Sequence, residues 1–520
     1  MQHYYYCEYL SVDEANLFTI IALPNKNGKF PTVIYRNPYF DQHEKMSEKE
    51  VYEDLKQVFD TWVNNGYAVV LQHCRGTGKS SGECIPYINE KKDGLALHDY
   101  IRKQSFYNGE LYLVGGSYCC SVHLLTAPFK DDIKGAIFEV QDSNRYNCNY
   151  RNGFYKIGLH GNWYVDMYKK KSMPNKNFNE HSYNLVPLSL FSLLVFNEEV
   201  PSFDLILHHP NKDDEFWNSK IAGGETKNAV KHANIPILFT TAWYDIYTGG
   251  VFDMWNNLDD FTKNQSALLV NPYNHACDPT LEPVIFEKGN MYEMFPDFEV
   301  KWINHIRKIN DSPFELGKVT YYKSFENKWC TDDFIESGKS LTFILGDKEV
   351  TYTYDPQNPA TFKGGLSTNF GGCEWQDKPH QREDIITVYT PEFEKDTIIK
   401  GKIKVLLNVK SNCEDTCFYV RLSLCKSEGD YGLRDDINQI SNFNENYIPN
   451  SEIQMDFSFD EHAFKVAKGE KIRIDISSSA LPHYVRHTNN KGLFSTQRTI
   501  KIADNTVILN KSSITLPIEK

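Results

Sequence analysis

The sequence predicts an α/β domain with a parallel sheet, a helical insertion within that domain, and a C-terminal all-β domain of the jelly-roll type. Three observations support this prediction. Strand-like and helix-like segments alternate over residues 1–140 and 232–312, but the strand pattern is lost over 141–231. Over residues 313–520, short alternating runs separated by turn residues replace the helical periodicity. Finally, an apolar strand at 111–114 runs into glycine and then serine, a pattern typical of a strand that turns sharply into a helix.

Both parts of the α/β domain supply strands and helices in alternation. Hydrophobic periodicity predicts helices over residues 47–65, 91–104 and 294–309. Strands of the sheet are predicted at residues 17–23, 32–35, 67–72, 134–140, 235–242 and 267–270. Such alternation predicts a parallel sheet with helices on both faces.

The insertion and the C-terminal region each have a pattern of their own. Residues 141–231 are rich in Tyr, Asn and Lys, and they contain an apolar run of helical character at 185–196. We expect them to form a cap over the active site. In the C-terminal region, strands of a jelly-roll sandwich are predicted at residues 341–345, 385–389, 401–409, 418–424, 453–457, 471–477 and 499–502.

The composition argues against several classes of function. The 520 residues carry a net charge of −13, whereas nucleic-acid binding needs clustered Lys and Arg. The N-terminus lacks the charged and apolar regions of a signal peptide, and no apolar run is long enough for a membrane span. We therefore expect a cytoplasmic protein with no nucleic-acid or membrane partner. The twelve cysteines are expected to be reduced thiols, and no metal site or cofactor is expected.

The segment 111–120 gives the strongest indication of chemistry. Four apolar residues lead into Gly115-Gly116-Ser117, and a run of small and apolar residues follows that can continue as a helix. This pattern predicts a nucleophile elbow, in which a strained turn exposes the serine Oγ above the sheet. A serine is a poor nucleophile until a base and an oxyanion site surround it. The sequence must therefore also supply an acid and a histidine.

Both groups follow downstream, each at the end of a predicted strand. Asp245 comes just after the strand at 235–242, and His275 lies in the loop after the strand at 267–270. The order Ser117, Asp245, His275 is that of α/β hydrolases. Each residue alone has a structural interpretation, as a chance glycine–serine pair, a turn aspartate or a surface histidine. Their joint occurrence in this order favours a catalytic triad.

Several separate blocks of sequence resemble the CocE/NonD hydrolases. This family is related to X-prolyl dipeptidyl peptidases of the S15 type, cocaine esterase and α-amino-acid ester hydrolases. The resemblance rests on the arginine–proline–tyrosine loop at 35–39, the glycine- and serine-rich segment 72–82, the elbow at 115–118, the acid block 243–245, His275, and two blocks at 461–464 and 474–482. It implies an α/β-hydrolase fold with a cap and a C-terminal jelly-roll sandwich.

The resemblance also implies roles for residues around the triad. Tyr39 would donate its hydroxyl to the oxyanion, and the backbone N–H of Tyr118 would be the second donor. The substrate pocket is expected to include Tyr247 and Trp243. The chain departs from the family pattern at Cys120, where a glycine is usual, so we expect a slightly looser approach of the elbow helix to the sheet.

The leading hypothesis is a serine hydrolase that cleaves a small ester or amide through an acyl-enzyme. One alternative is an X-prolyl or aminoacyl dipeptidyl peptidase, which would need a negative site for the substrate amine. A second alternative is a catalytically silent protein that binds ligands through the sandwich. The expected partner is a small molecule or short peptide. The sequence leaves the oligomeric state open, with a homodimer among the options.

Overall fold

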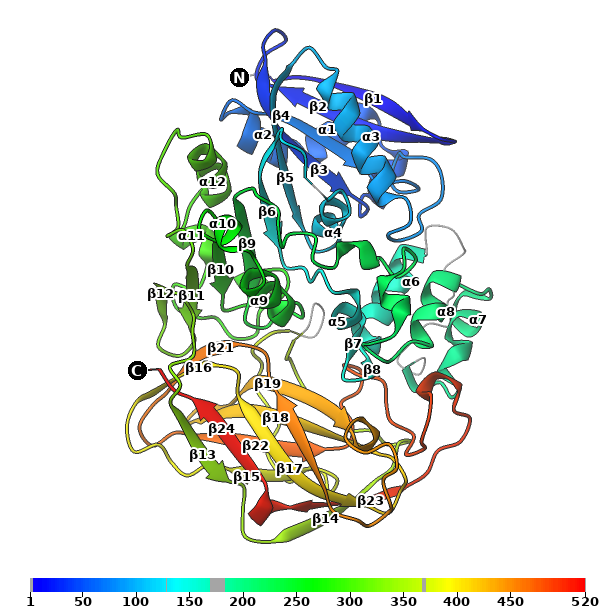
Figure 1. Cartoon of the computed structure of the whole chain (residues 1–520), viewed down its shortest axis with the longest axis vertical. Coiled ribbons are helices and arrows are strands. Elements are labelled where there is room, and N and C mark those ends of the chain that lie inside the picture. The colour runs from blue at the N-terminus through cyan, green and yellow to red at the C-terminus, as the bar shows by residue number, and fades with distance from the viewer. Residues whose placement is uncertain (1–2, 128, 169–182, 367–370, 520) are drawn as a thin grey trace.

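A computed structural model of the chain shows an α/β domain, a cap beside it and an all-β domain below both (Figure 1). It describes residues 3–127, 129–168, 183–366 and 371–519. The N-terminus lies at the far end of the α/β domain, and the C-terminus lies where the α/β and all-β domains meet (Figure 1). No helix of the described segments is long and apolar enough to cross a membrane.

A ten-stranded sheet forms the centre of the α/β domain. Its strands lie in the order β1-β2-β4-β3-β5-β6-β9-β10-β11-β12, and neighbours from β4 to β11 run parallel. Antiparallel strands close both edges. The bounds are β1 Tyr4–Val12, β2 Ala15–Leu23, β3 Phe30–Asn37, β4 Ala68–His73, β5 Tyr107–Gly116, β6 Ile133–Glu139, β9 Ile237–Ala242, β10 Ala267–Asn271, β11 Val319–Lys323 and β12 Lys328–Asp332.

Helices cover both faces of this sheet, as the alternating pattern predicts. One hydrophobic core contains apolar side chains of α3, α4 and α9, and the core on the other face contains those of α1, α2 and α12. The bounds are α1 Glu48–Asp54, α2 Lys56–Val63, α3 Glu90–Arg102, α4 Tyr118–Leu124, α9 Thr248–Asn256, α10 Asp260–Lys263, α11 Met291–Met294 and α12 Phe298–Ile306.

The cap consists of short helices and one small hairpin. Its described elements are α5 Arg145–Asn149, β7 Tyr150–Arg151, β8 Phe154–Tyr155, a π-helix at Ile157–Gly161, α6 Asn162–Tyr168, α7 Phe191–Phe196 and α8 Pro201–Leu207. Its aromatic core is continuous with side chains of the all-β domain, among them Tyr419 and Tyr484. Because these side chains share one core, the cap is fixed against the all-β domain.

The C-terminal region is a β-sandwich. A six-stranded and a four-stranded sheet bury their facing side chains in one core, which includes Leu407 of one sheet and Ile474 of the other. The bounds are β13 Ser340–Ile344, β14 Glu349–Tyr354, β15 Ile386–Tyr389, β16 Thr397–Gly401, β17 Lys404–Ser411, β18 Cys417–Lys426, β19 Gly429–Gln439, β20 Ile453–Ser458, β21 His462–Val466, β22 Lys471–Ser477, β23 Ala503–Ile508 and β24 Ser513–Pro517.

Three expectations about elements need correction. The predicted helix at 47–65 is two helices, because Leu55 leaves helical geometry (ψ 7°) while its side chain stays in the core. The predicted strand at 499–502 is wrong: this segment pairs with no strand, and β23 begins at Ala503. The large sheet also continues past residue 312, since β11 pairs with β10 and β12 pairs with β11.

Candidate active site

The elbow predicted from the sequence is a sharp turn between β5 and α4. Ser117 has φ 53° and ψ −129°, a strained conformation for a residue with a side chain. Its amide donates to the carbonyl of Glu139 at the end of β6 (2.9 Å). A side chain at position 115 would clash, because a Cβ there would lie 2.4 Å from the carbonyl oxygen of Cys119. Cys120 is fully buried in the core beside the sheet, so the elbow accommodates a thiol at this position.

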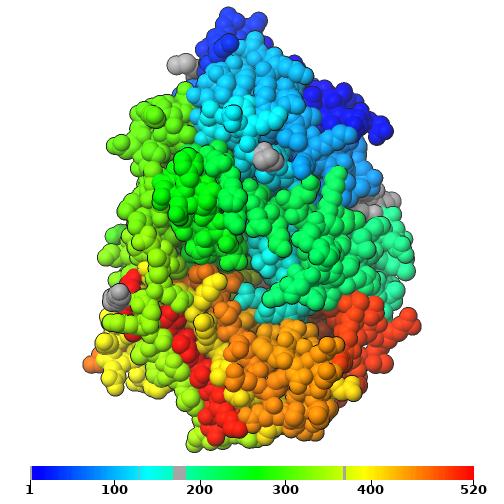
Figure 2. Space-filling model, in the orientation of Figure 1, coloured from blue at the N-terminus to red at the C-terminus, as the bar shows by residue number. Residues whose placement is uncertain are grey.

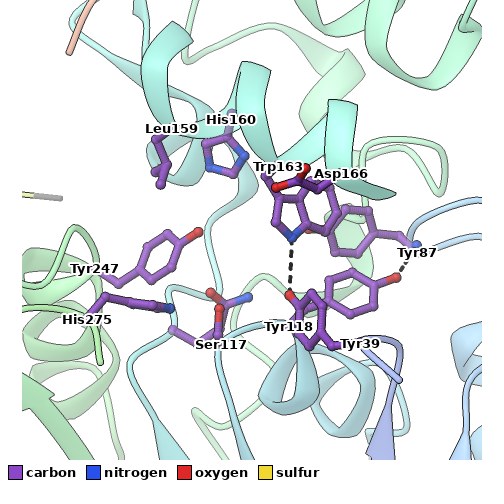
Figure 3. A pocket seen from close by; sticks show the side chains of 11 residues that line it. Tyr39, Tyr87, Ser117, Tyr118, Leu159, His160, Trp163, Asp166, Tyr247 and His275 are labelled. Carbon is purple, nitrogen blue, oxygen red and sulfur yellow. Dashed lines mark hydrogen bonds between the residues drawn. The ribbon is translucent and has the colours of Figure 1, made fainter. Parts of the chain in front are cut away.

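His275 and Asp245 lie together at the carboxyl ends of neighbouring strands. The Nδ1 of His275 is 2.8 Å from Oδ1 of Asp245, which is fully buried. The carboxylate also accepts hydrogen bonds from the Thr241 hydroxyl (2.9 Å) and the Tyr247 amide (3.2 Å). Since the carboxylate accepts from Nδ1–H, neutral His275 presents Nε2 as an acceptor. Figure 3 shows that this side of the ring points toward Ser117.

Ser117 and His275 lie at the base of a cavity of about 310 Å³. Its described surface comes from the elbow, from the loop before α3, from the loops after β3, β6, β9 and β10, and from the cap helix α6 with the π-helix before it. Its lining is mostly aromatic and polar and consists of Tyr39, Tyr87, Tyr118, Gln141, Leu159, His160, Trp163, Asp166 and Tyr247, besides Ser117 and His275. A cavity of this size suits a small ligand.

Tyr39 comes from the loop after β3 and faces this cavity. Desolvation raises its pKa above the usual value, although hydrogen bonding from the Trp163 and Ser117 side chains partly lowers it. The phenol therefore keeps its proton at neutral pH. Tyr118 lines the cavity as the first residue of α4, so its amide has no acceptor within the helix.

The Tyr118 side chain ties the elbow to α3. Its hydroxyl donates to Glu90 Oε1 (3.1 Å) and accepts from the Tyr87 amide (2.8 Å). The Glu90 carboxylate also forms an ion pair with Arg36, whose Nη2 lies 3.2 Å from Oε2 of Glu90, and both side chains are buried. The arginine of the loop at 35–39 is thus structural, and it connects β3 to the elbow through α3.

Of the two residues expected at the substrate pocket, only Tyr247 lines this cavity. Trp243 is fully buried in the core beneath the acid loop. Its indole N–H donates to the carbonyl of Tyr322 (2.5 Å), and its ring stacks on Phe252. Trp243 therefore packs in the core beneath the loop that carries Asp245. The expectation that it lines the substrate pocket is corrected.

The sequence did not identify the cap residues of the site. Leu159 and His160 reach the cavity from the π-helix, and Trp163 and Asp166 reach it from α6 (Figure 3). Burial, with Arg145 and Lys156 close by, holds the pKa of His160 well below its usual value, so this ring is neutral. The composition of the cap carries no periodic signal that would single out these positions.

Comparison with known proteins assigns the chain to a family. Residues 13–277 match the X-Pro dipeptidyl-peptidase (S15 family), and residues 315–513 match the X-Pro dipeptidyl-peptidase C-terminal non-catalytic domain. The chain belongs to the S15 family. The resemblance seen in the sequence motifs is thereby confirmed, and this S15 chain is a serine hydrolase that acts on ester or peptide bonds.

The similarity of this S15 chain to its relatives extends over nearly its whole length. It is 22% identical to the cocaine esterase of Rhodococcus sp. (strain MB1 Bresler), over 94% of this chain and 92% of the esterase. Similar solved structures include an aminopeptidase from the marine sediment archaeon Thaumarchaeota archaeon (TM-score 0.82, 16% identity, 99% of this chain and 96% of that one). An α-amino acid ester hydrolase has a TM-score of 0.83 at 16% identity, over 99% of this chain and 97% of that one. A CocE/NonD family hydrolase from Staphylococcus aureus has a TM-score of 0.66 at 14% identity, over 100% of this chain and 94% of that one.

The match to a non-catalytic domain agrees with the position of the sandwich. Its described residues do not line the cavity. They instead contact the segments that do. Arg151 of the cap pairs with Asp436 (2.7 Å) and Asp460 (2.8 Å) of the sandwich. The Tyr244 hydroxyl, next to Asp245, donates to the carbonyl of Gly432 (2.9 Å).

Proposed function

We propose that the chain hydrolyses a small ester or amide through an acyl-enzyme on Ser117. The observation that supports this most strongly is the convergence of three groups: a serine at a strained turn, a histidine whose Nε2 faces it, and a buried carboxylate bonded to Nδ1. These are the groups that make a serine hydroxyl nucleophilic.

In this mechanism His275 takes the proton of Ser117 as Oγ attacks the substrate carbonyl. The imidazolium is stabilised by Asp245, which remains ionised. Collapse of the tetrahedral intermediate breaks the ester or amide bond, and His275 gives its proton to the leaving group. Water then attacks the acyl-enzyme, with His275 again as base, and releases the acid and free Ser117.

Two donors are proposed to stabilise the oxyanion. The Tyr39 hydroxyl and the Tyr118 amide both lie at the cavity beside Ser117. A developing negative charge on the carbonyl oxygen needs such preorganised donors. The raised pKa of Tyr39 supports this role, because the phenol remains a donor throughout the neutral range.

The sandwich, which we take to be of the jelly-roll type, is proposed to support the site and not to bind the substrate. Its described residues contact the cap and the loops that carry Asp245 and His275. The small aromatic cavity favours a compact substrate with an apolar or planar acyl group.

A second candidate is an X-prolyl dipeptidyl peptidase, which the family match favours. Such an enzyme needs a negative group for the substrate ammonium. Asp166 is the cavity-lining carboxylate that could serve, whereas Asp259 caps α10 at the surface. Hydrolysis of Ala-Pro-p-nitroanilide that is lost in Asp166→Asn, with unchanged hydrolysis of p-nitrophenyl acetate, would favour this function.

Labelling with a fluorophosphonate probe tests the proposed function without knowledge of the substrate. We expect one adduct, mapped by mass spectrometry to Ser117, in the wild type and none in Ser117→Ala or His275→Ala. His232→Ala is the matched control, because His232 also pairs with an aspartate (2.9 Å) but lies at the surface. A folded wild type without an adduct would contradict the proposal and favour a silent binding protein.

A further inference from the structure

A hydrogen bond joins the cap to the proposed oxyanion site. The indole Nε1 of Trp163, on α6, lies 3.1 Å from the hydroxyl oxygen of Tyr39, in the loop after β3 (Figure 3). The two residues are 124 positions apart in sequence. They belong to segments that meet at the cavity that contains Ser117.

The direction of this bond follows from the chemistry of its two groups. An indole N–H can only donate, whereas a phenol oxygen can donate one hydrogen bond and accept others. Tyr39 is therefore the acceptor, and its own proton remains for another partner. Tyr39 and Ser117 line the same cavity, so the partner we assign to this proton is the oxyanion that forms beside Ser117 during the reaction.

The bond also makes the phenol a better donor. A hydroxyl that accepts a hydrogen bond is polarised, and the hydrogen bond that it donates becomes stronger. Without the indole N–H, the Tyr39 hydroxyl would lose the donor that disfavours the orientation in which its own proton points toward α6. Its proton would then point toward the oxyanion for only part of the time, and reorientation would cost free energy during the reaction.

Packing holds the indole in place. The Trp163 ring lies 5.5 Å from the ring of Tyr118, whose amide is the second proposed donor, and 5.0 Å from Tyr164 in an edge-on contact. Its ring centroid lies 6.2 Å from His160. Trp163 thus contacts both residues that supply the proposed oxyanion donors.

We propose that Trp163 is a positioning residue of the oxyanion hole, through which the cap orients the Tyr39 hydroxyl toward the reacting oxygen. This inference rests on the proposed function. It differs from the simpler role of Trp163 as an aromatic surface for the substrate, because that role needs the ring but not the N–H.

Trp163→Phe separates the two roles, since it keeps an aromatic ring and removes the donor. For p-nitrophenyl acetate we expect kcat to fall about fivefold with KM within twofold of the wild type, because the lost bond acts on the transition state. The second-order rate of phosphonylation by a fluorophosphonate should fall by a similar factor, since the adduct also places an oxygen in the oxyanion site.

A double-mutant cycle with Tyr39→Phe identifies the path of the effect. If Trp163 acts through the Tyr39 hydroxyl, Trp163→Phe should change the phosphonylation rate less than twofold in the Tyr39→Phe background. Trp217→Phe is the matched control. Trp217 is a second cap tryptophan; it is buried, and its N–H donates to the carbonyls of His209 and Asn211 within the cap. We expect it to retain the wild-type rate.

Four results would overturn the inference. Independent, multiplicative effects of the two substitutions, or a change in KM alone, would show that Trp163 acts through packing. An equal loss in Trp217→Phe would point to general loosening of the cap. These first three outcomes leave the proposed function intact when the wild type is phosphonylated at Ser117. A wild type that is not phosphonylated would overturn the proposed function together with this inference.

Discussion

Ser117 has a backbone conformation that few residues with a side chain adopt, at φ 53°. Such strain costs roughly 1–3 kcal/mol and persists only where the surroundings enforce it. Here the strain is maintained by the hydrogen bond from the Ser117 amide to Glu139 and by the close approach of Cys119 to Gly115. The absence of a side chain at position 115 is therefore what allows the turn.

Gly115→Ala tests this requirement. The new Cβ would lie 2.4 Å from the carbonyl oxygen of Cys119, so α4 must move. We expect a loss of roughly 1–3 kcal/mol in stability and at least about a tenfold slower phosphonylation of Ser117. Gly116→Ala is the control, since its Cβ would meet Glu139 at an ordinary 3.5 Å. Equal behaviour of the two variants in urea unfolding would contradict the explanation.

Cys120 provides a second test at the residue scale. Its thiol is fully buried in the core, although related hydrolases were expected to have glycine there. In this chain Cys120→Gly should lower stability by roughly 2 kcal/mol, because it removes a buried side chain and places glycine within a helix. The urea midpoint should fall less in Cys120→Ala. A midpoint in Cys120→Gly equal to that of the wild type would show that the elbow helix moves to fill the space.

At the scale of elements, a chain of hydrogen bonds supports the loop that carries Tyr39. The Lys79 amide donates to His73 Nδ1 (3.1 Å), His73 Nε2 lies 3.3 Å from His43 Nδ1, and His43 Nε2 lies 2.7 Å from Asp54. Because Nδ1 of His73 accepts, each neutral ring donates through Nε2 to the next group. Phe40, next to Tyr39, stacks on His43. The hydrogen bonds that hold His43 in place therefore also hold the loop that carries Tyr39.

Asp54→Ala removes the final acceptor of this chain while changing only a partly exposed side chain. We expect a loss of about 1 kcal/mol in stability and a fall of a few-fold in kcat, because the loop carrying Tyr39 becomes less ordered. Glu53→Ala is the control, since Glu53 is the exposed neighbour on the same helix. An unchanged kcat in Asp54→Ala would show that the loop is ordered without the histidines.

At the scale of the whole molecule, the sandwich stabilises the loops that carry Asp245 and His275. Glu282 accepts the amide of Asn274, next to His275, at 2.7 Å, and the amide of Gly372 in the sandwich region at 3.1 Å. Desolvation, reinforced by Glu374 and Asp278, raises the pKa of Glu282 to about 7 against these two hydrogen bonds. Ionisation of Glu282, which joins the two segments through these hydrogen bonds, therefore lowers the stability of the folded protein.

Glu282→Gln should separate stability from activity. An acid with a raised pKa binds its proton more readily in the folded state, so its contribution to stability falls as pH rises from about 4.5 to 7. A neutral glutamine has no such dependence. We expect the variant to match the wild type in thermal midpoint at pH 5 and to exceed it at pH 8.

At pH 8 the same variant should have a lower kcat, since an amide cannot accept both backbone N–H groups. The control is Glu287→Gln, an exposed acid in the same loop, which should show neither effect. A Glu282→Gln midpoint that falls further below the wild type as pH rises would mean that the ionised bridge stabilises the fold.

Local pattern was sufficient for most of the architecture. The alternation of β and α elements, the two-faced covering of the sheet and the elbow at Ser117 all follow from periodicity and short motifs. Strands at the edges of the sheet were harder to predict from the sequence. Strand β1 was not predicted, and residues 319–332, which form β11 and β12 of the large sheet, were assigned to the C-terminal domain without a predicted strand. The pairing of an edge strand depends on partners that are distant in sequence.

The sequence by itself determined the order of Ser117, Asp245 and His275 and their places at strand ends, since these depend on neighbouring residues along the chain. Only the tertiary structure decided which aromatic side chains face the cavity. Trp243 and Tyr247 flank the same aspartate, yet one supports it from the core and the other lines the pocket. Likewise, Trp163 meets Tyr39 only where the cap and the loop after β3 come together at the cavity. The direction of a side chain is set by the packing of whole elements, and local sequence does not encode that packing.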